Sequence, residues 1–157
     1  MRALFIISYF PPMGYGGERQ ALLLAKTLVQ QGSCVEVLTR HRRGLKREDS
    51  IEGVSVHRRG VAHGGKIGSV LAALLWTLFI LRYGRRYDVF HAHQPHSAML
   101  IALLGKLVWG GAAIVKMPGT RGVERVTGSR VRAAMLSRFV DAVAVMNRDH
   151  MLQLEDA

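Results

Sequence analysis

The sequence predicts an α/β fold: a Rossmann-like, doubly wound parallel sheet of about six strands in the order 3-2-1-4-5-6, with helices on both faces. Short apolar runs alternate with helical patterns along all 157 residues, which suits a single domain over residues 1–157. The first run, Ala3–Ser8, is apolar without alternation, as expected of a strand buried on both faces. Ligands of such sheets bind at the carboxyl ends of the strands, near the point where the strand order reverses.

In the first half of the chain, Ala3–Ser8 is followed by a helix over Gly17–Gln31. Its apolar residues recur at helical spacing, and Gly32 stands at its end. A second apolar strand is expected at Cys34–Thr39. The charged run "HRRGLKREDS" is expected to be a loop, and Val54–Arg59 is a weaker strand with turn signals on both sides.

In the second half, the apolar run within Ile67–Leu81 predicts a helix, and Asp88–Ala92 predicts the fourth strand. A helix over Ser97–Val108 and a fifth strand at Ala112–Met117 follow. After a glycine-rich basic loop, the alternation continues through a helix at Arg130–Arg138, a strand at Asp141–Met146 and a helix from Arg148 to Leu154.

The composition points to an anionic partner. Twenty-two Lys and Arg residues against 11 Asp and Glu give a net charge of +11, which favours phosphate groups, nucleic acid or an acidic membrane surface. Nucleic acid is disfavoured because aromatic residues make up only 7% and no reader motif is present. A single cysteine, Cys34, excludes an internal disulfide, and no signal peptide is visible, so we expect a cytoplasmic protein.

The longest apolar run, Val70–Leu81, has two interpretations. It is shorter than the roughly 20 residues of a membrane-spanning helix, which favours a buried core helix. Lys66 and the segment Arg82–Arg86 flank it with positive charge, which favours a helix that dips into an anionic membrane surface. The second interpretation implies a peripheral position at the cytoplasmic face of the membrane.

The stretch "PPMGYGGERQ" lies between the first strand and the first helix. Gly16 and Gly17 would let a phosphate approach the backbone N–H groups of the helix N-terminus, although they could also only form the turn. A dinucleotide fingerprint fails because Arg19 stands where its third glycine belongs. Arg40, after the second strand, could still meet a 2′-phosphate, so an NADP-binding oxidoreductase domain remains an alternative.

In "HAHQPH", His91 and His93 are two residues apart and share a face if both are extended. Together with His96 they form an incomplete ligand set, so no metal is expected. His93 lies at the carboxyl end of the fourth strand, where it can hydrogen-bond a hydroxyl or phosphate, or act as a base.

A second anion contact is predicted after the fifth strand, unless this segment is only a solvated basic loop. Glycines and basic side chains alternate there: Lys116, Gly119, Arg121, Gly122, Arg125 and Arg130. The run "RHRRGLKR" after the second strand is either solvated or steers an anionic substrate.

Three segments resemble the N-terminal domain of family 4 retaining glycosyltransferases (glycosyl transferases group 1), which have the GT-B fold. They are "ISYFPPMGYGGERQALLLAKTLVQQGSCVEVLTR", "YDVFHAHQPHSAMLIALLG" and "FVDAVAVMNRDHMLQL". The resemblance implies a two-domain enzyme with its active site between the domains. This chain would be the acceptor-side domain, and the C-terminal nucleotide-sugar domain would be absent from it.

The resemblance implies that Gly16 and Gly17 approach the donor diphosphate, that Arg19 lies in the cleft and that His93 borders it. Pro118-Gly119 stands where many members have His-Gly, so Lys116 is the candidate for the missing contact with the transferred sugar. Asn147 replaces a common Ser. His93 and Lys116 are therefore the candidate catalytic residues.

The implied reaction moves a hexosyl unit from a nucleotide-diphosphate sugar to a lipid-linked or polysaccharide acceptor. No cofactor or metal is expected, and no Asp-x-Asp motif is present. The 157 residues alone are expected to be inactive without the missing domain or a partner chain. A non-catalytic membrane-docking or regulatory module is a third interpretation, because it too would need a partner.

Overall fold

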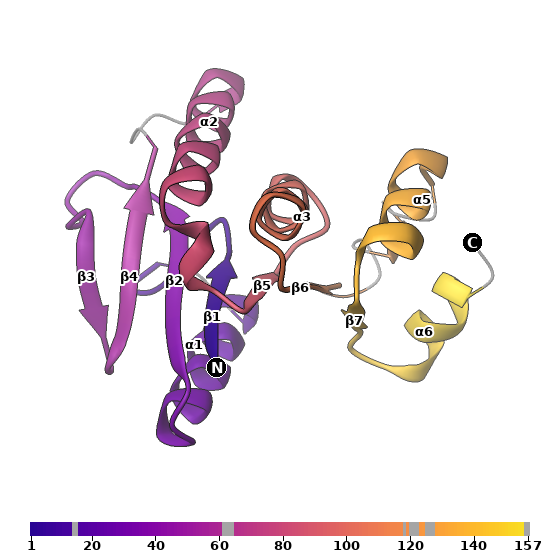
Figure 1. Cartoon of the computed structure of the whole chain (residues 1–157), viewed down its shortest axis with the longest axis horizontal. Coiled ribbons are helices and arrows are strands. Elements are labelled where there is room, and N and C mark those ends of the chain that lie inside the picture. Colours follow the sequence, from indigo (N-terminus) through magenta and orange to yellow (C-terminus); the bar gives the residue numbers. More distant parts are fainter. Residues whose placement is uncertain (14–15, 61–64, 118, 120–122, 125–127, 156–157) are drawn as a thin grey trace.

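A seven-stranded sheet with the order β3-β4-β2-β1-β5-β6-β7 organises the computed structural model of the chain (Figure 1). The structure describes residues 1–157 except 14–15, 61–64, 118, 120–122, 125–127 and 156–157. The strands are β1 Arg2–Ile6, β2 Cys34–Arg40, β3 Glu48–Ile51, β4 Val54–Arg59, β5 Val89–Ala92, β6 Ala112–Lys116 and β7 Ala142–Ala144. The helices are α1 Gly16–Gln30, α2 Gly65–Tyr83, the short 3₁₀ helix η1 Gly84–Arg86, α3 Ser97–Trp109, α5 Arg130–Phe139 and α6 Arg148–Glu155.

The six expected strands pair in parallel and in the expected order. The seventh, β3, was expected to be part of a charged loop, and that prediction was wrong. β3 adds antiparallel to β4 at the edge of the sheet. Its acidic residues tolerate this place because Glu48 pairs with Arg59 and His57, and Asp49 pairs with Arg58.

The strand order reverses at β1, which pairs with β2 on one side and with β5 on the other. Ile6 lies opposite Ala92 in this register, so the loops after β1 and β5 leave the sheet side by side. β6 follows β5 in the sheet, and Ala92 pairs with Val115. The segments that begin after Ile6, Ala92 and Val115 therefore meet at one edge.

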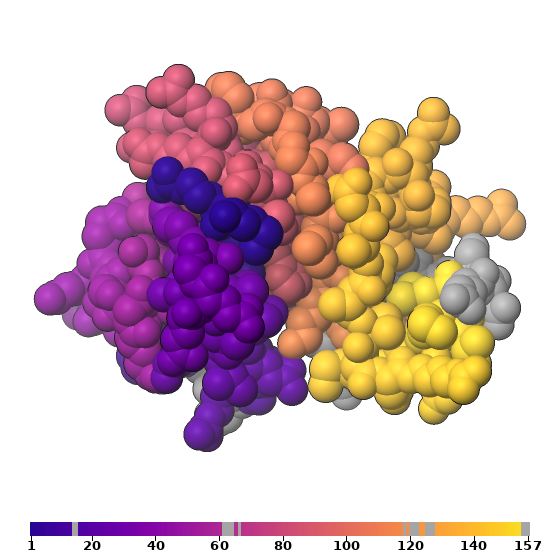
Figure 2. Space-filling view, turned by 60° about the horizontal axis from the view of Figure 1, so that its bottom comes forward, coloured from indigo at the N-terminus to yellow at the C-terminus, as the bar shows by residue number. Residues whose placement is uncertain are grey.

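Each face of the sheet has its own core (Figure 1). On one face, Phe5 and Val37 pack against Ala21 and Ala25 of α1. On the other face, which α2 and α3 cover, the large buried side chains are Leu4, Ile6, Leu38, Trp76, Phe79, Ile80, Phe90 and Met99. In the space-filling view the first residues (indigo) lie between the purple segment of α1 and β2 and the pink-to-orange segment of α2 and α3 (Figure 2).

Close packing under α3 depends on a glycine. A Cβ atom at Gly105 would lie 2.6 Å from a ring carbon of Phe90, which is fully buried. The helix can therefore rest directly on β5, and a larger residue at position 105 would push it away. Phe90 directly precedes His91 on β5, and His93 follows the end of this strand.

α2 buries only one side, so it is not the buried core helix that the length of its apolar run favoured. Trp76, Phe79 and Ile80 are buried against the sheet, whereas the outer side of α2 is exposed and apolar. The segment Ile67–Arg86 is long and apolar enough to cross a membrane by length and composition, and 33% of an 18-residue stretch within it is buried. Only the exposed side of α2 is available for the contact with a membrane surface that the second interpretation implies.

Candidate functional site

Gly16 and Gly17 begin α1, at the carboxyl edge of the sheet. A Cβ atom at either position would meet nothing within 4 Å, and neither glycine has a positive φ. The fold itself therefore does not require glycine at these two positions. The N–H groups of the first helical turn have no partner within the helix, so the open space in front of them suits an anion.

His93 reaches the same edge from the segment after β5. Its side chain is only 3% exposed, and Nδ1 and Nε2 have no hydrogen-bond partner among the described residues. Burying two polar ring atoms in this way is unfavourable unless a ligand or water satisfies them. His93 is thus a preformed hydrogen-bonding group that the rest of the described chain does not use.

His91 and His93 share a face, as the sequence predicted, with ring centroids 4.3 Å apart. Phe5 packs against both rings, at 4.9 Å and 4.8 Å. Burial lowers the pKa of His91 to about 4, with a further contribution from the positive charge of Lys116. Burial, His91 and Lys116 likewise lower the pKa of His93 well below its usual value. Both imidazoles are therefore neutral at physiological pH, and each has one donor and one acceptor nitrogen.

Lys116 is the last residue of β6 and points back toward α1. Its Nζ donates a hydrogen bond to Oε1 of Gln20 at 2.9 Å, and partial burial lowers its pKa. A lysine in this position adds positive charge beside the helix N-terminus. It links the end of β6 to α1, although 96 residues separate Lys116 from Gln20 in the sequence.

A cavity of about 220 Å³ lies where these elements meet, lined by Ile7, Gly17, Glu18, His93, Gln94 and Lys116. Three residues that the sequence predicted, Gly17, His93 and Lys116, thus come together from the start of α1, the segment after β5 and the end of β6. Glu18 and Gln94 were not predicted. The side chain of Gln94 accepts a hydrogen bond from the hydroxyl of Ser8, which follows β1. Gln94 belongs to the segment "HAHQPH", and its place directly after a predicted strand was the signal that could have identified it.

The remaining predicted residues do not line this cavity. Arg19 is exposed on α1, and Arg40 ends β2 two strands away from β5. Gly119 has a φ of 72° and lies beyond Lys116, while Arg121 and Arg125 lie outside the described residues. Asn147 caps α6: its Oδ1 accepts a hydrogen bond from the N–H of His150 at 2.9 Å. The structure gives Asn147 this structural role.

Within the described part of the chain, His, Cys, Asp and Glu form no group of three that could hold a metal ion. The cavity instead combines the backbone N–H donors at the start of α1, the ammonium of Lys116 and the neutral imidazole of His93, and the carboxylate of Glu18 also lies in its lining. Such a set can hold an anionic group and hydrogen-bond a neighbouring hydroxyl.

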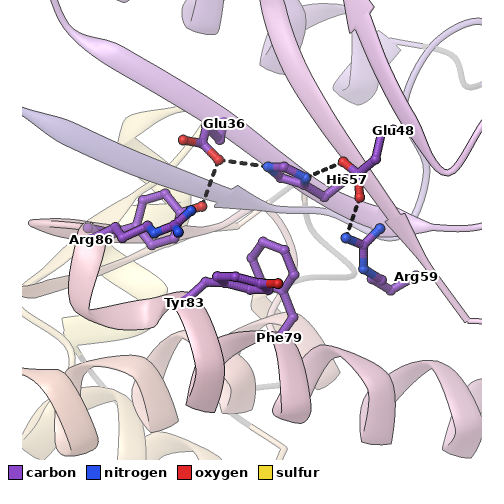
Figure 3. A pocket seen from close by; sticks show the side chains of 8 residues that line it. Glu36, Glu48, His57, Arg59, Phe79, Tyr83 and Arg86 are labelled. Carbon is purple, nitrogen blue, oxygen red and sulfur yellow. Dashed lines mark hydrogen bonds and ion pairs between the residues drawn. The ribbon is translucent and has the colours of Figure 1, made fainter.

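A second cavity, of about 300 Å³, opens between the sheet and the end of α2 (Figure 3). His57 bridges two carboxylates, with Nε2 2.7 Å from Glu36 and Nδ1 2.5 Å from Glu48. The hydroxyl of Tyr87 also donates to Glu36, at 2.8 Å. Phe79 and Tyr83 of α2 form the apolar wall of the cavity. The sequence analysis missed this cluster, although an acidic residue inside the apolar strand "CVEVLT" marked its position.

The charges of this cluster stabilise one another. The hydrogen bond from His57 is the main cause that lowers the pKa of Glu36 to about 2, against the opposing effect of burial. Burial opposes a charge on His57, but its bonds to Glu36 and Glu48 outweigh that cost and raise its pKa. The cluster is satisfied internally, which distinguishes it from the unpartnered His93.

Comparisons with known proteins agree with this architecture. The model of the family described as Glycosyltransferase Family 4 matches residues 15–145. No match to a curated protein was found by sequence. Sucrose-phosphate synthase from Thermosynechococcus elongatus is similar in structure, with a TM-score of 0.63 and 12% identity over 92% of this chain.

A second structure of sucrose-phosphate synthase from Thermosynechococcus elongatus has a TM-score of 0.59 and 10% identity, covering 99% of this chain and 95% of that one. MurG of Acinetobacter baumannii has a TM-score of 0.60 and 16% identity over 96% of this chain. The chain spans 47% of the first sucrose-phosphate synthase chain and 42% of the MurG chain. These similarities show the fold and match this chain to about half of each of those two proteins.

Proposed function

Because this chain belongs to Glycosyltransferase Family 4, we propose that it is the acceptor-binding, N-terminal half of a retaining GT-B glycosyltransferase. The proposed enzyme moves a hexosyl unit from a nucleotide-diphosphate sugar to a lipid-linked or polysaccharide acceptor. The family membership makes the chain a glycosyltransferase domain. Its donor, acceptor and stereochemistry are part of the proposal.

The cavity between α1, β5 and β6 is the observation that carries this proposal. Gly17 leaves the helix N-terminus open, and His93 offers two unpartnered ring nitrogens at the same place. The fold needs neither feature, but a bound diphosphate and a sugar hydroxyl would use both. This supports a donor site whose inner wall is formed by this chain.

Catalysis in this proposal is electrostatic. Negative charge develops on the leaving diphosphate, and the N–H groups of Gly16 and Gly17 together with the ammonium of Lys116 stabilise it. The neutral ring of His93 donates a hydrogen bond to the sugar or accepts one from it, which orients the sugar without a change of charge. The proposed scheme uses no metal and no cofactor.

Arg19 and Arg40, together with the segment from Gly119 to Arg121, are proposed as outer substrate contacts, and Asn147 as a contact near the cleft. Arg19 lies on α1, Arg40 ends β2, Gly119 follows β6 and Asn147 precedes α6, and none of these four lines the cavity. We propose that a second domain or a partner chain supplies the opposite wall of the cleft, because this chain matches only 47% of the sucrose-phosphate synthase chain. Transfer by the 157 residues alone should then be negligible. The proposed location is cytoplasmic.

Isothermal titration of the chain with nucleotide-diphosphate sugars and with NADP tests the proposal. We expect weak, roughly millimolar binding of the sugar nucleotides (about −4 kcal/mol), since half of the cleft is missing, and no NADP binding. Gly17→Val should abolish the sugar-nucleotide signal. Micromolar binding of NADP would instead favour an oxidoreductase domain, and robust transfer by the 157 residues would contradict the need for a second half.

A further inference from the structure

The outer side of α2 carries a continuous apolar stripe. Its members are spaced by three or four residues, and their exposed fractions range from 43% to 78%: Ile67, Val70, Leu74, Leu78 and Leu81. This spacing places all five on one side of a helix, opposite the buried Trp76 and Ile80. A helix that is apolar on its exposed side as well as on its core side needs a second apolar environment.

Positive charge surrounds the end of the stripe. Arg82, Arg85 and Arg86 follow Leu81 and are exposed, and no acidic residue occurs from Gly65 to Arg86. Trp109 of α3 lies beside this end, where its Nε1 donates to the carbonyl oxygen of Ile80 at 2.8 Å while 41% of the residue stays exposed. An amphipathic tryptophan next to arginines and an apolar stripe is typical of the boundary between lipid headgroups and acyl chains.

A groove of about 210 Å³ runs along α2 beside the stripe, lined by Arg59, Leu75, Leu78, Phe79, Arg82 and Tyr83. It adjoins the second cavity, with which it shares Arg59, Phe79 and Tyr83 (Figure 3). The guanidinium of Arg59 lies 5.3 Å from the ring centre of Phe79, and that of Arg82 lies 5.4 Å from the ring centre of Tyr83. Arg59 is held by Glu48 and by two carbonyl groups, so Arg82 is the guanidinium that a lipid phosphate would meet here. An apolar floor beside a guanidinium group suits a phosphate that is attached to a hydrocarbon chain.

We propose that α2 lies in the interface of an anionic bilayer, with Leu74 and Leu78 inserted among the acyl chains and Arg82 bound to a lipid phosphate. α2 and α3, pink and orange in Figure 2, adjoin along one side of the molecule, so the same surface can include Trp109. The proposal deepens the proposed function, because it selects a lipid-linked acceptor over a soluble one. It does not depend on that function, because the binding can be measured without catalysis.

A bilayer fits this surface better than a second copy of the chain. In a pairing of two copies through α2, parallel or antiparallel, the arginines at the end of the stripe would meet no acidic residue on the α2 of the other copy, because none occurs from Gly65 to Arg86. Anionic headgroups supply that negative charge, and each arginine near such a surface contributes about a fivefold increase in affinity, from the ~1 kcal/mol of a basic residue at an anionic membrane.

Vesicle flotation of the 157-residue chain tests the proposal. We expect binding to vesicles of phosphatidylcholine with phosphatidylglycerol to be at least about tenfold stronger than to phosphatidylcholine alone. The double variant Leu74→Ser/Leu78→Ser should lose at least about tenfold, since two inserted leucines are removed. Arg82→Gln with Arg85→Gln should weaken vesicle binding by about fivefold for each arginine removed. Lysine in place of glutamine at position 82 should restore part of this loss, because the positive charge returns.

Matched controls come from α1 and α6. Leu23→Ser removes a leucine that is 64% exposed on the opposite face of the sheet, and Arg148→Gln removes an exposed arginine at the start of α6; both should bind like the original chain. Thermal unfolding verifies that each variant is folded. Equal binding of neutral and anionic vesicles, or equal losses in the control variants, would overturn the proposal. So would light scattering that shows a dimer which Leu74→Ser/Leu78→Ser converts to monomers.

Discussion

Arg58 donates a hydrogen bond from its guanidinium to the carbonyl oxygen of Pro11, 2.9 Å away and 47 residues earlier in the chain. The side chain of Arg58 is completely buried, and it also bonds the carbonyl oxygen of Lys46 and the carboxylate of Asp49. One arginine on β4 therefore holds the loop that leads from β1 into α1. That loop ends at Gly16 and Gly17, the glycines at the mouth of the cavity.

Replacing Arg58 with methionine should lower the free energy of unfolding by about 2 kcal/mol, because two carbonyl groups lose their donor. Urea unfolding of the purified chain measures this loss. The matched variant is Arg59→Met, the next residue along β4, whose partly exposed bonds to Glu48 and to two carbonyls should contribute about 1 kcal/mol or less. Equal losses in the two variants would contradict the role assigned to Arg58.

Gly17→Val should strongly reduce sugar transfer by the enzyme that contains this domain while leaving the domain folded. A Cβ atom fits without a clash, so the free energy of unfolding should change by no more than about 0.5 kcal/mol. The added methyl groups would occupy the space in front of the helix N-terminus, and a loss of about 100-fold in transfer is expected from displacing the donor. Leu23→Val, an exposed substitution on the same helix, is the control. Unchanged transfer in Gly17→Val would mean that the two glycines only form the turn and do not contact the donor.

Most of the sheet could be predicted from the sequence because parallel strands buried on both faces leave uninterrupted apolar runs. The six runs and their order are confirmed, since β-α-β connections of one hand permit few alternatives. β3 escaped prediction because its residues, Glu48 to Ile51, are mostly polar. It becomes a strand only through pairing with charges on β4 that lie next to it in space.

The site could be predicted only in part. Residues at or after strand ends were predictable, since the strand ends of a parallel sheet meet at one edge. This is why Gly17 at the start of α1, His93 after β5 and Lys116 at the end of β6 share a cavity. Gln94 was quoted without a role, and Glu18 was passed over, because polar residues beside a helix start give no pattern. The bridge of His57 between Glu36 and Glu48 joins three strands, and no spacing in the sequence announces it.

Lys116→Met should raise the pKa of His91 above its value of about 4. The ammonium of Lys116 disfavours a second positive charge nearby, and burial, the larger cause, would still keep the pKa below 6.5. The chemical shifts of the imidazole ring, followed by NMR against pH, measure the change. Lys106→Met is the control, because Lys106 is held by Asp141 and the carbonyl of Phe139. An unchanged pKa of His91 in Lys116→Met would contradict the claim that the ammonium of Lys116 lowers this pKa.

The bridge at His57 should make stability depend on pH. Its folded-state pKa lies above 6.5, so its contribution is complete below pH 6.5 and is lost as pH rises through the folded pKa. The slope for one proton cannot exceed about 1.4 kcal/mol per pH unit. Urea unfolding from pH 6 upward measures it, and His57→Gln should remove this decline. A variant that declines like the original chain would contradict the assignment.

Glu36 titrates in a separate window. Its pKa is about 2 in the folded state against an ordinary value of 4.5, so its contribution is present above pH 4.5 and is lost as pH falls toward 2. Glu36→Gln should therefore reduce the loss of stability in acid while leaving Tyr87 a partner. A curve in acid unchanged from that of the original chain would mean that Glu36 is not held by its two neighbours.

The most direct test of the central claim is a pair of NMR titrations of the 157-residue chain, one with a nucleotide-diphosphate sugar and one with NADP. The account predicts that the sugar nucleotide shifts the amides of Gly16 and Gly17 and the ring signals of His93, that Gly17→Val removes these shifts, and that NADP produces none. Shifts of the same residues by micromolar NADP, or no response to millimolar sugar nucleotide, would contradict a donor site in this cavity.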